Sequence, residues 1–139
     1  YAVLNGLVHS KVFAAGANYY GVAELIMLAE DTHDFESRYL DSLIGPYPEQ
    51  KELYIERSPL THADNLTSPL IIFQGSDDPI VPPSQSQAFR DACIKNGVKY
   101  KYFEFEGESH GFRKSQTITT CAIEELKFFG EVLGFVPAD

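Results

Sequence analysis

The sequence predicts an α/β fold in which helices cover both faces of a mostly parallel sheet. Strand-like runs occupy residues 12–17, 69–74 and 100–106, and helix-prone segments lie between and after them. This alternation is typical of parallel strands joined by helical crossovers. Because three strands are fewer than an open α/β sheet usually holds, we expect the chain to contribute part of a larger sheet.

The N-terminal half opens with small residues over positions 1–9 that read as the end of a helix. The run 12–17 is apolar without alternation, which predicts a buried strand. Residues 23–29 favour a helix, and a polar and aromatic stretch follows that closes in a Gly-Pro-Tyr-Pro turn at 45–48. The Ser-Pro pair at 58–59 predicts a short helical turn, because Ser is a good N-cap and Pro suits the first helical position.

The run 69–74 is the clearest strand, and its lack of alternation indicates a central strand covered on both faces. A loop rich in Gly, Asp and Pro follows over 75–83. Ser84 is the expected N-cap of the next helix, with Gln87 in the capping-box position. That helix should end at Asn96-Gly97. Its apolar side would consist of Ala88, Phe89, Ala92 and Cys93.

The last strand is predicted over 100–106, and a loop with two glycines, a histidine and a phenylalanine follows over 107–112. A final helix closes the chain. Its apolar residues at helical spacing are Ile118, Ala122, Leu126, Phe129 and Leu133.

Composition excludes several classes of function. Eleven Lys and Arg against twenty Asp and Glu give a formal charge of −9, which argues against binding nucleic acid or anionic membranes. No apolar run approaches the roughly 18 residues of a membrane span. Cys93 and Cys121 are too few for a disulfide scaffold and have no metal-type spacing, so we expect reduced thiols, with a lone disulfide less favoured, in a cytoplasmic protein without cofactor or metal.

Two predicted loops carry the groups of an acid–base relay. Asp77 and Asp78 follow one strand, and His110 follows the next. Active sites of open α/β sheets gather at the carboxyl ends of strands, so these side chains should meet. A carboxylate that accepts the Nδ1 hydrogen fixes the histidine tautomer and stabilises the imidazolium, and the imidazole can then deprotonate a nucleophile. Either residue alone would more often be an ordinary turn or surface residue.

Other candidates are weaker. The acidic segment 30–36 contains one histidine but no recognisable ligand spacing, so a solvated face is the better interpretation. His9 and His62 are isolated in the sequence and suit structural or surface roles. Cys93 and Cys121 lie in predicted helices, where buried packing thiols are the expectation.

The two loops also carry a family resemblance. Residues 75–82 resemble the G-x-x-D-x-x-V-P element of α/β-hydrolases, and residues 106–112 resemble their E-G-x-x-H-G-F element. Nearly the whole chain is similar to the C-terminal half of the prolyl oligopeptidase (S9) catalytic domain, so residues 1–139 would form part of that domain. Further matches are Glu36-Ser37-Arg38-Tyr39-Leu40, Ile44-Gly45-Pro46-Tyr47, Ser58-Pro59-Leu60, Pro69-Leu70-Ile71 and Gln85-Ser86.

The resemblance implies roles for particular residues. Asp78, the third residue after Gly75, matches the aspartate of a catalytic triad, and His110 matches its histidine. Asp77 would be a solvated neighbour. The segment after the first strand would line the pocket for the residue that precedes the cut bond. Its candidates are Tyr19, Tyr20, Val22 and Leu25, with Val81 nearby, although core packing explains each of them equally well.

The sequence departs from the family in one respect: it contains no G-x-S-x-G nucleophile elbow. Residues 1–7 resemble the helix after that elbow, so we expect the serine, the earlier strands, the oxyanion-hole loop and any β-propeller to precede Tyr1. The expected function is peptide hydrolysis by the whole protein, with this chain inactive alone. Alternatives are an esterase or dienelactone-type hydrolase, and a non-catalytic binding or assembly module. Its expected partners are a peptide substrate, the N-terminal part, and a second copy.

Overall fold

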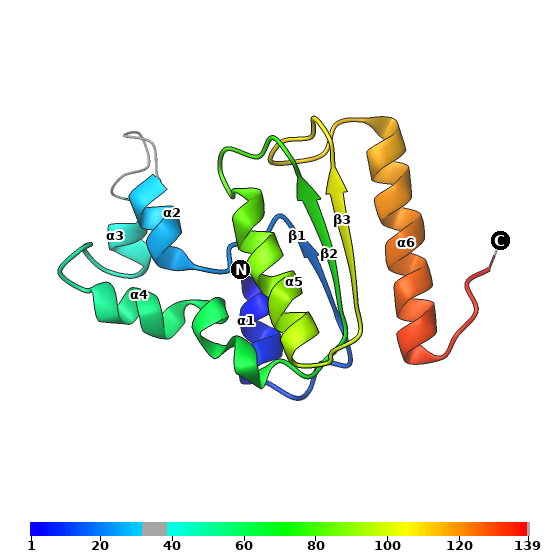
Figure 1. Ribbon diagram of the computed structural model, residues 1–139, viewed down its shortest axis with the longest axis horizontal. Helices are drawn as coiled ribbons and strands as arrows, with labels where there is room; N and C mark the ends of the chain where they lie inside the picture. Colours follow the sequence, from blue (N-terminus) through cyan, green and yellow to red (C-terminus); the bar gives the residue numbers. More distant parts are fainter. Residues whose placement is uncertain (32–38, 139) are drawn as a thin grey trace.

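The structure, a computed structural model, describes residues 1–31 and 39–138. Its centre is a parallel sheet of β1 (Gly16–Tyr19), β2 (Leu70–Gly75) and β3 (Tyr100–Phe105) in the order β1-β2-β3 (Figure 1). In the register, Tyr19 is the partner of Phe73, and Gly75 is the partner of Phe105. The loops that follow β2 and β3 therefore leave the sheet side by side at its carboxyl edge, which is where the predicted site lies.

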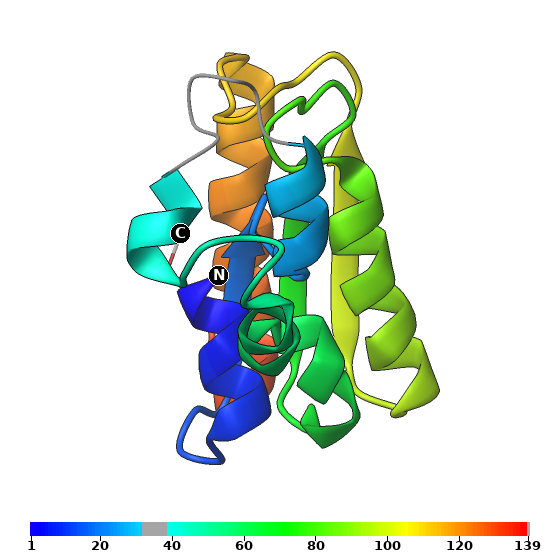
Figure 2. The same ribbon diagram turned by 90° about the vertical axis from the view of Figure 1, so that its left-hand side faces the viewer.

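Helices cover both faces of this sheet. On one face lie α1 (Ala2–His9), the 3₁₀ turn η1 (Pro59–Asn65) and α5 (Pro83–Lys95), and on the other lies α6 (Ser115–Leu133) (Figures 1 and 2). Three short helices extend beyond α1 on the same side: α2 (Leu25–Asp31), α3 (Tyr39–Leu43) and α4 (Lys51–Arg57). The predicted α/β layering is confirmed.

Two cores flank the central strand. Because successive residues of β2 point to opposite faces, Leu70 and Ile72 pack under α1 and α5, and Ile71 and Phe73 pack under α6. Every residue of β2 is buried, as a continuous apolar run predicts for a central parallel strand. A third, smaller cluster around Tyr54 joins α2, α3 and α4.

The first strand begins later than predicted. The chain enters the sheet only at Gly16, whose N–H donates to the carbonyl of Pro69 at 3.0 Å, and Val12 and Phe13 stay exposed. At this position α1 packs directly on the strand, since a Cβ on Gly16 would stand 2.7 Å from Cδ1 of Leu7. Of the apolar run 12–17, only residues 16 and 17 therefore belong to the strand, and residues 12–15 connect α1 to it.

The predicted capping box of α5 is wrong. The helix begins two residues earlier, with Pro82 in the N-cap position and Pro83 as its first residue, and no side chain caps it. Two consecutive prolines set the backbone angles of the first turn, so a cap from Ser84 is not needed. Gln87, expected to reach back to the helix start, donates instead to Glu104 at 3.3 Å. The predicted end of this helix, by contrast, is confirmed: Lys95 is its last residue, and Gly97 has φ +64°.

The apolar stripe chosen for α6 is also wrong in part. The residues it buries against the sheet are Thr117, Cys121 and Phe128, with Phe129 half-buried beside them. Ile118, Leu126 and Leu133 are each about half exposed. The helix carries apolar residues on two sides, and periodicity alone does not say which side meets the aromatic face of the sheet. Within the described residues, no helix is both long and apolar enough to span a bilayer.

Candidate active site

Asp78 and His110 meet at the carboxyl edge of the sheet. Oδ2 of Asp78 lies 3.0 Å from Nδ1 of His110, within the hydrogen-bonding range expected of a relay. The Asp78 side chain is fully buried, whereas the His110 side chain is 37% exposed. The carboxylate therefore contacts Nδ1 from inside the protein, and the rest of the imidazole ring faces the exposed side of the site.

The loop after β2 orients the Asp78 carboxylate. Its other oxygen, Oδ1, accepts hydrogen bonds from the backbone N–H groups of Ile80 and Val81, each at 2.9 Å. Both bonds are local, so the turn itself fixes the carboxylate and leaves Oδ2 for His110. Asp77, the alternative, is exposed and accepts a bond from the hydroxyl of Ser76 at 2.6 Å. Of the two neighbouring aspartates, only Asp78 is hydrogen-bonded to His110.

A buried amide supports this turn from within the sheet. Gln74, the penultimate residue of β2, donates through Nε2 to the carbonyl of Val81 at 3.1 Å and reaches Oδ2 of Asp78 at 3.5 Å. Its Oε1 accepts from the hydroxyl of Ser86 on α5 at 2.6 Å. Sequence reasoning missed Gln74, although a polar residue inside an otherwise apolar strand was a usable signal, because such residues are buried only when hydrogen-bonded.

A second carboxylate, Glu108, holds the loop that carries His110. It is buried, and its two oxygens accept from the backbone N–H groups of Arg113 and Lys114, each at 2.9 Å, at the start of α6. These bonds, that to Arg113 foremost, lower the pKa of Glu108, because hydrogen bonding stabilises the ionised form. Sequence reasoning missed this role, since an acidic residue in a Gly-containing loop gives no sign of its partners.

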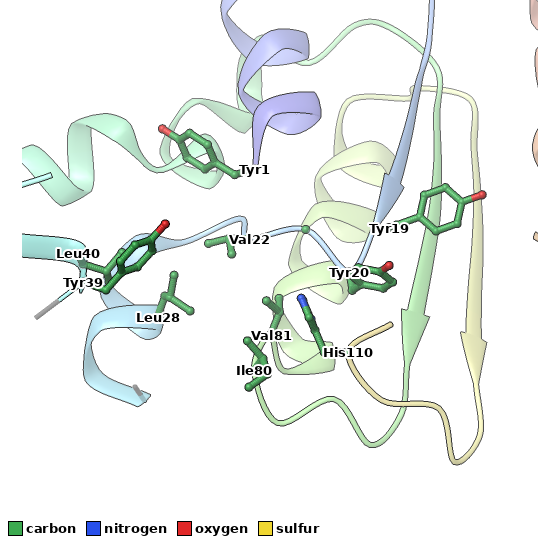
Figure 3. Close-up of a pocket in the computed structure, with 11 residues that line it drawn as sticks. Tyr1, Tyr19, Tyr20, Val22, Leu28, Tyr39, Leu40, Ile80, Val81 and His110 are labelled. Carbon is green, nitrogen blue, oxygen red and sulfur yellow. The ribbon is translucent and has the colours of Figure 1, made fainter. Parts of the chain in front are cut away.

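An apolar pocket of about 350 Å³ opens beside His110 (Figure 3). His110, Tyr20 and Val81 stand on one side of it, and Leu28, Tyr39 and Leu40 stand on the other, with Val22 between them (Figure 3). The first residue of the chain, Tyr1, also lines it. A second pocket of about 370 Å³ adjoins the first, because Val22, Leu28 and Leu40 line both.

The residues suggested for substrate binding do not all line the same pocket. Val22 and Val81 line the pocket beside His110, whereas Leu25 is buried and lines only the second pocket. Tyr19 touches the wall of the first pocket, but its ring is directed away from it (Figure 3). Its hydroxyl donates to Glu125 of α6 at 2.7 Å, and burial together with this bond raises the pKa of Tyr19.

Gln85 on α5 positions the segment between Val22 and Leu25. Its buried Oε1 accepts from the backbone N–H groups of Ala23 and Glu24 at 2.8 and 2.7 Å, and its Nε2 donates to the carbonyl of Glu24 at 2.9 Å. Gln85 was noted in the sequence as part of the family resemblance, without a role. One amide thus ties the pocket wall to the helix that follows the Asp78 loop.

The remaining candidates are not part of this site. His9 and His62, isolated in the sequence, lie together with ring centroids 4.5 Å apart at the far end of α1. Cys93 and Cys121 are buried free thiols in separate cores. Most of the acidic segment 30–36, like the match at Glu36-Ser37-Arg38, lies outside the described residues. Among those described, no three His, Cys, Asp or Glu side chains gather as metal ligands would.

A parallel sheet between helical layers, with an aspartate and a histidine hydrogen-bonded at its carboxyl edge, defines an α/β-hydrolase. Comparison with known proteins gives the family. The model of the prolyl oligopeptidase family matches residues 1–135, and the chain belongs to that family.

The individual relatives include two peptidases and an esterase. A solved puromycin-hydrolysing peptidase from Mycobacterium tuberculosis superposes with a TM-score of 0.93 at 47% identity, over 98% of this chain and 21% of that one. Dipeptidyl aminopeptidase BIII from Pseudoxanthomonas mexicana is 30% identical over 96% of this chain and 20% of its own length. Esterase LipQ from M. tuberculosis is 29% identical over 86% of this chain and 30% of its own. The chain therefore spans about a fifth to a third of the length of these relatives.

Proposed function

We propose that this chain provides the aspartate and the histidine of a Ser–His–Asp triad in a serine peptidase. The observation that carries the proposal is the 3.0 Å contact between Oδ2 of buried Asp78 and Nδ1 of the partly exposed His110 beside an apolar pocket. With Nδ1–H donated to Asp78, Nε2 carries the lone pair that a general base needs.

In the proposed reaction, Nε2 of His110 takes the proton of a serine hydroxyl while the serine oxygen bonds to the scissile carbonyl carbon. Asp78 stabilises the resulting imidazolium without accepting its proton. The imidazolium then protonates the leaving amine, the C–N bond breaks, and an acyl-enzyme remains. Water, deprotonated by His110, releases the acid and restores the serine.

The serine would come from a segment that precedes Tyr1 in a longer protein. Two observations support this origin. The sequence has no G-x-S-x-G, and Ser76 beside the site is engaged in its own loop, where its hydroxyl donates to Asp77 and accepts from the N–H of Gly107. Tyr1, at the start of α1, lines the same pocket as His110, so a preceding turn would enter beside the imidazole.

The pocket supports an apolar or aromatic side chain on the acyl side of the cleaved bond. Apart from His110, its wall is formed largely by aliphatic and tyrosine side chains. Together with the 47% identity to a puromycin-hydrolysing peptidase, this favours peptides and aminoacyl amides such as puromycin as substrates.

Labelling with a fluorophosphonate probe tests the proposal. The whole protein should label at one serine N-terminal to Tyr1, and the 139-residue chain alone should not. His110→Ala in the whole protein should lower peptide turnover by about 10⁴- to 10⁶-fold, because triad members act as a unit. Labelling of Ser76 or Ser109 in the short chain would show that the nucleophile lies elsewhere.

Ester hydrolysis is the second candidate, favoured by the similarity to an esterase over 86% of the chain. The same triad cleaves both bonds, so turnover of matched substrates that differ only in an amide or ester bond decides between them. An esterase would leave the amide uncut even when the acyl group is optimal. Absence of both activities, with intact folding, would support the non-catalytic alternative.

A further inference from the structure

Tyr20 has an unusual backbone conformation directly beside the site. It follows β1 and has φ +39°, and it is the one non-glycine residue with positive φ among those that the structure describes. Side chains with a bulky ring rarely adopt this region, because Cβ crowds the backbone there. Such strain persists only where the surroundings impose it, and it collects at functional sites.

The surroundings of Tyr20 do impose it. Its backbone N–H donates to the carbonyl of Phe73 on β2 at 2.8 Å, which continues the sheet ladder by one residue. The next residue, Gly21, lies close against the buried Asn18 side chain, since a Cβ there would stand 2.1 Å from its Oδ1. The chain is thus pinned on both sides of Tyr20, and the turn aims its ring at the edge of the sheet where the loop after β3 lies.

The Tyr20 ring contacts that loop twice. Its centroid lies 4.6 Å from the centroid of His110, with the planes inclined at 56°, and 5.2 Å from that of Phe112, with the planes at 88°. The edge-to-face geometry with Phe112 is a favoured aromatic arrangement. In Figure 3 Tyr20 and His110 stand against each other at the pocket wall.

His110 needs such a contact. Its hydrogen bond to Asp78 restrains one ring nitrogen, but a single bond leaves the imidazole free to tilt about that contact. More than a third of the side chain is exposed, so burial does not hold it either. A ring packed on the imidazole restrains the tilt that the carboxylate does not. Asp78, which follows β2, therefore restrains the position of Nδ1. Tyr20, which follows β1, restrains the tilt of the imidazole ring.

We propose that Tyr20 is a positioning residue that holds the imidazole of His110 at the angle required for proton transfer. The inference rests on the proposed function for its kinetic consequence, but the contact itself can be measured without turnover. The ring is the active part, and the hydroxyl is not needed.

Two substitutions in the whole protein distinguish the effect of the Tyr20 ring from the effect of its backbone conformation. Tyr20→Phe keeps the ring and should retain the kcat of the parent. Tyr20→Gly removes the ring and relieves the positive φ, so it should fold yet lose about tenfold to a hundredfold in kcat, the scale of a small misplacement of reacting groups. Phe135→Ala is the control, since it removes an exposed aromatic ring from the segment after α6 and lines neither of the two pockets near the site; it should leave both KM and kcat unchanged.

The low-field proton NMR signal of the His110 Nδ1–H bond to Asp78 provides the readout without turnover. It should broaden or shift in Tyr20→Gly and stay unchanged in Tyr20→Phe and Phe135→Ala. An unchanged signal and unchanged kcat in Tyr20→Gly, with His110→Ala inactive, would overturn the positioning role and leave the proposed function intact. A changed signal in a protein without hydrolytic activity would support the contact and contradict the function. If Tyr20→Gly does not fold, Tyr20→Leu takes its place with the same expectations.

Discussion

The α-carbon of Gly75 lies directly against the backbone of Glu108, and a Cβ at position 75 would stand 2.3 Å from the Glu108 carbonyl oxygen. That same oxygen accepts the N–H of Asp77 at 3.0 Å. The loop that carries Asp78 and the loop that carries His110 are thus in backbone contact before their side chains meet. The distance between the two functional groups depends on this close approach.

Gly75→Ala should therefore damage the site as well as the fold. The methyl group meets backbone atoms that cannot rotate away, and such overpacking costs about 1–3 kcal/mol of unfolding free energy. Urea unfolding measures the loss. Gly6→Ala is the control: its methyl meets only the Phe13 ring, at 3.3 Å, in a helix that favours alanine. Equal stability of the two variants would contradict the steric argument.

Asp78→Asn should abolish activity with little change in structure. The amide keeps the size of the carboxylate but cannot hold Nδ1–H of His110 in the required tautomer, and kcat of the whole protein should fall by about 10⁴-fold. Asp77→Asn, at the exposed neighbour, should have no comparable effect on kcat. Peptide hydrolysis by the two variants in parallel provides the test, and equal losses would mean that Asp78 has no special role.

Glu108 should make the fold sensitive to acid. Its pKa is lowered in the folded state from an ordinary 4.5, so its stabilising contribution is complete above that value. The contribution is lost as the pH falls through the lower folded pKa. Thermal melts between neutral and acidic pH should show a smaller acid-induced decrease in Glu108→Gln, which has already lost the carboxylate. The exposed Glu106→Gln should keep the dependence of the parent protein, and identical curves for all three would refute the role.

Both cysteines should resist alkylation while the protein is folded. Burial raises the pKa of Cys93 and of Cys121 to about 11, so each is a thiol, and a poor nucleophile, at neutral pH. Iodoacetamide should modify neither residue in native buffer and both in strong denaturant, as mass spectrometry would show. Rapid modification of the native protein would mean that one of the two cores opens.

The free edge of β1 should recruit another chain. Among the described residues β1 pairs with β2 alone, and beside it an apolar groove of about 340 Å³ runs between α1 and Phe129 of α6. Unpaired strand edges next to apolar surface favour association. We propose that a second copy, or the N-terminal part of a longer protein, covers this edge. Light scattering decides the matter, and a cooperatively folding monomer at micromolar concentration would contradict it.

Local signals made much of this fold predictable. The breakers after β2 and β3 located both loops, and the order of strands and helices placed them at one edge of a sheet. Asp78 could be chosen over Asp77 because the family element spaces it from Gly75. Helix α4 was not predicted, since its residues are mostly polar and its burial depends on Tyr54 packing in the cluster with α2 and α3.

The hydrogen-bond partners of the supporting residues could not be predicted for a different reason. Gln74, Glu108 and Gln85 act through hydrogen bonds to atoms on other elements, and no local pattern reports which atoms a fold will bring near. The pair Tyr19 and Tyr20 illustrates the same limit: both were candidates to line the pocket, but Tyr20 packs on His110, while the hydroxyl of Tyr19 binds Glu125 of α6. Successive side chains of a strand point to opposite faces, but the sequence does not indicate which face contacts the imidazole of His110.

The hydrogen bonds of the Asp78 carboxylate have a consequence for any attempt to redesign this site. Its Oδ1 accepts hydrogen bonds from the backbone N–H groups of Ile80 and Val81, and the side chains of these two residues line the pocket. The spacing between Asp78 and the pocket wall is therefore set by one turn of fixed length. Side chains at these two positions can be exchanged to admit different substrates, because their bonds to Asp78 run through the main chain. An insertion, a deletion or a proline there would change selectivity and catalysis at once, so a library meant to explore substrate range should vary residues 80 and 81 in place and leave the loop length untouched.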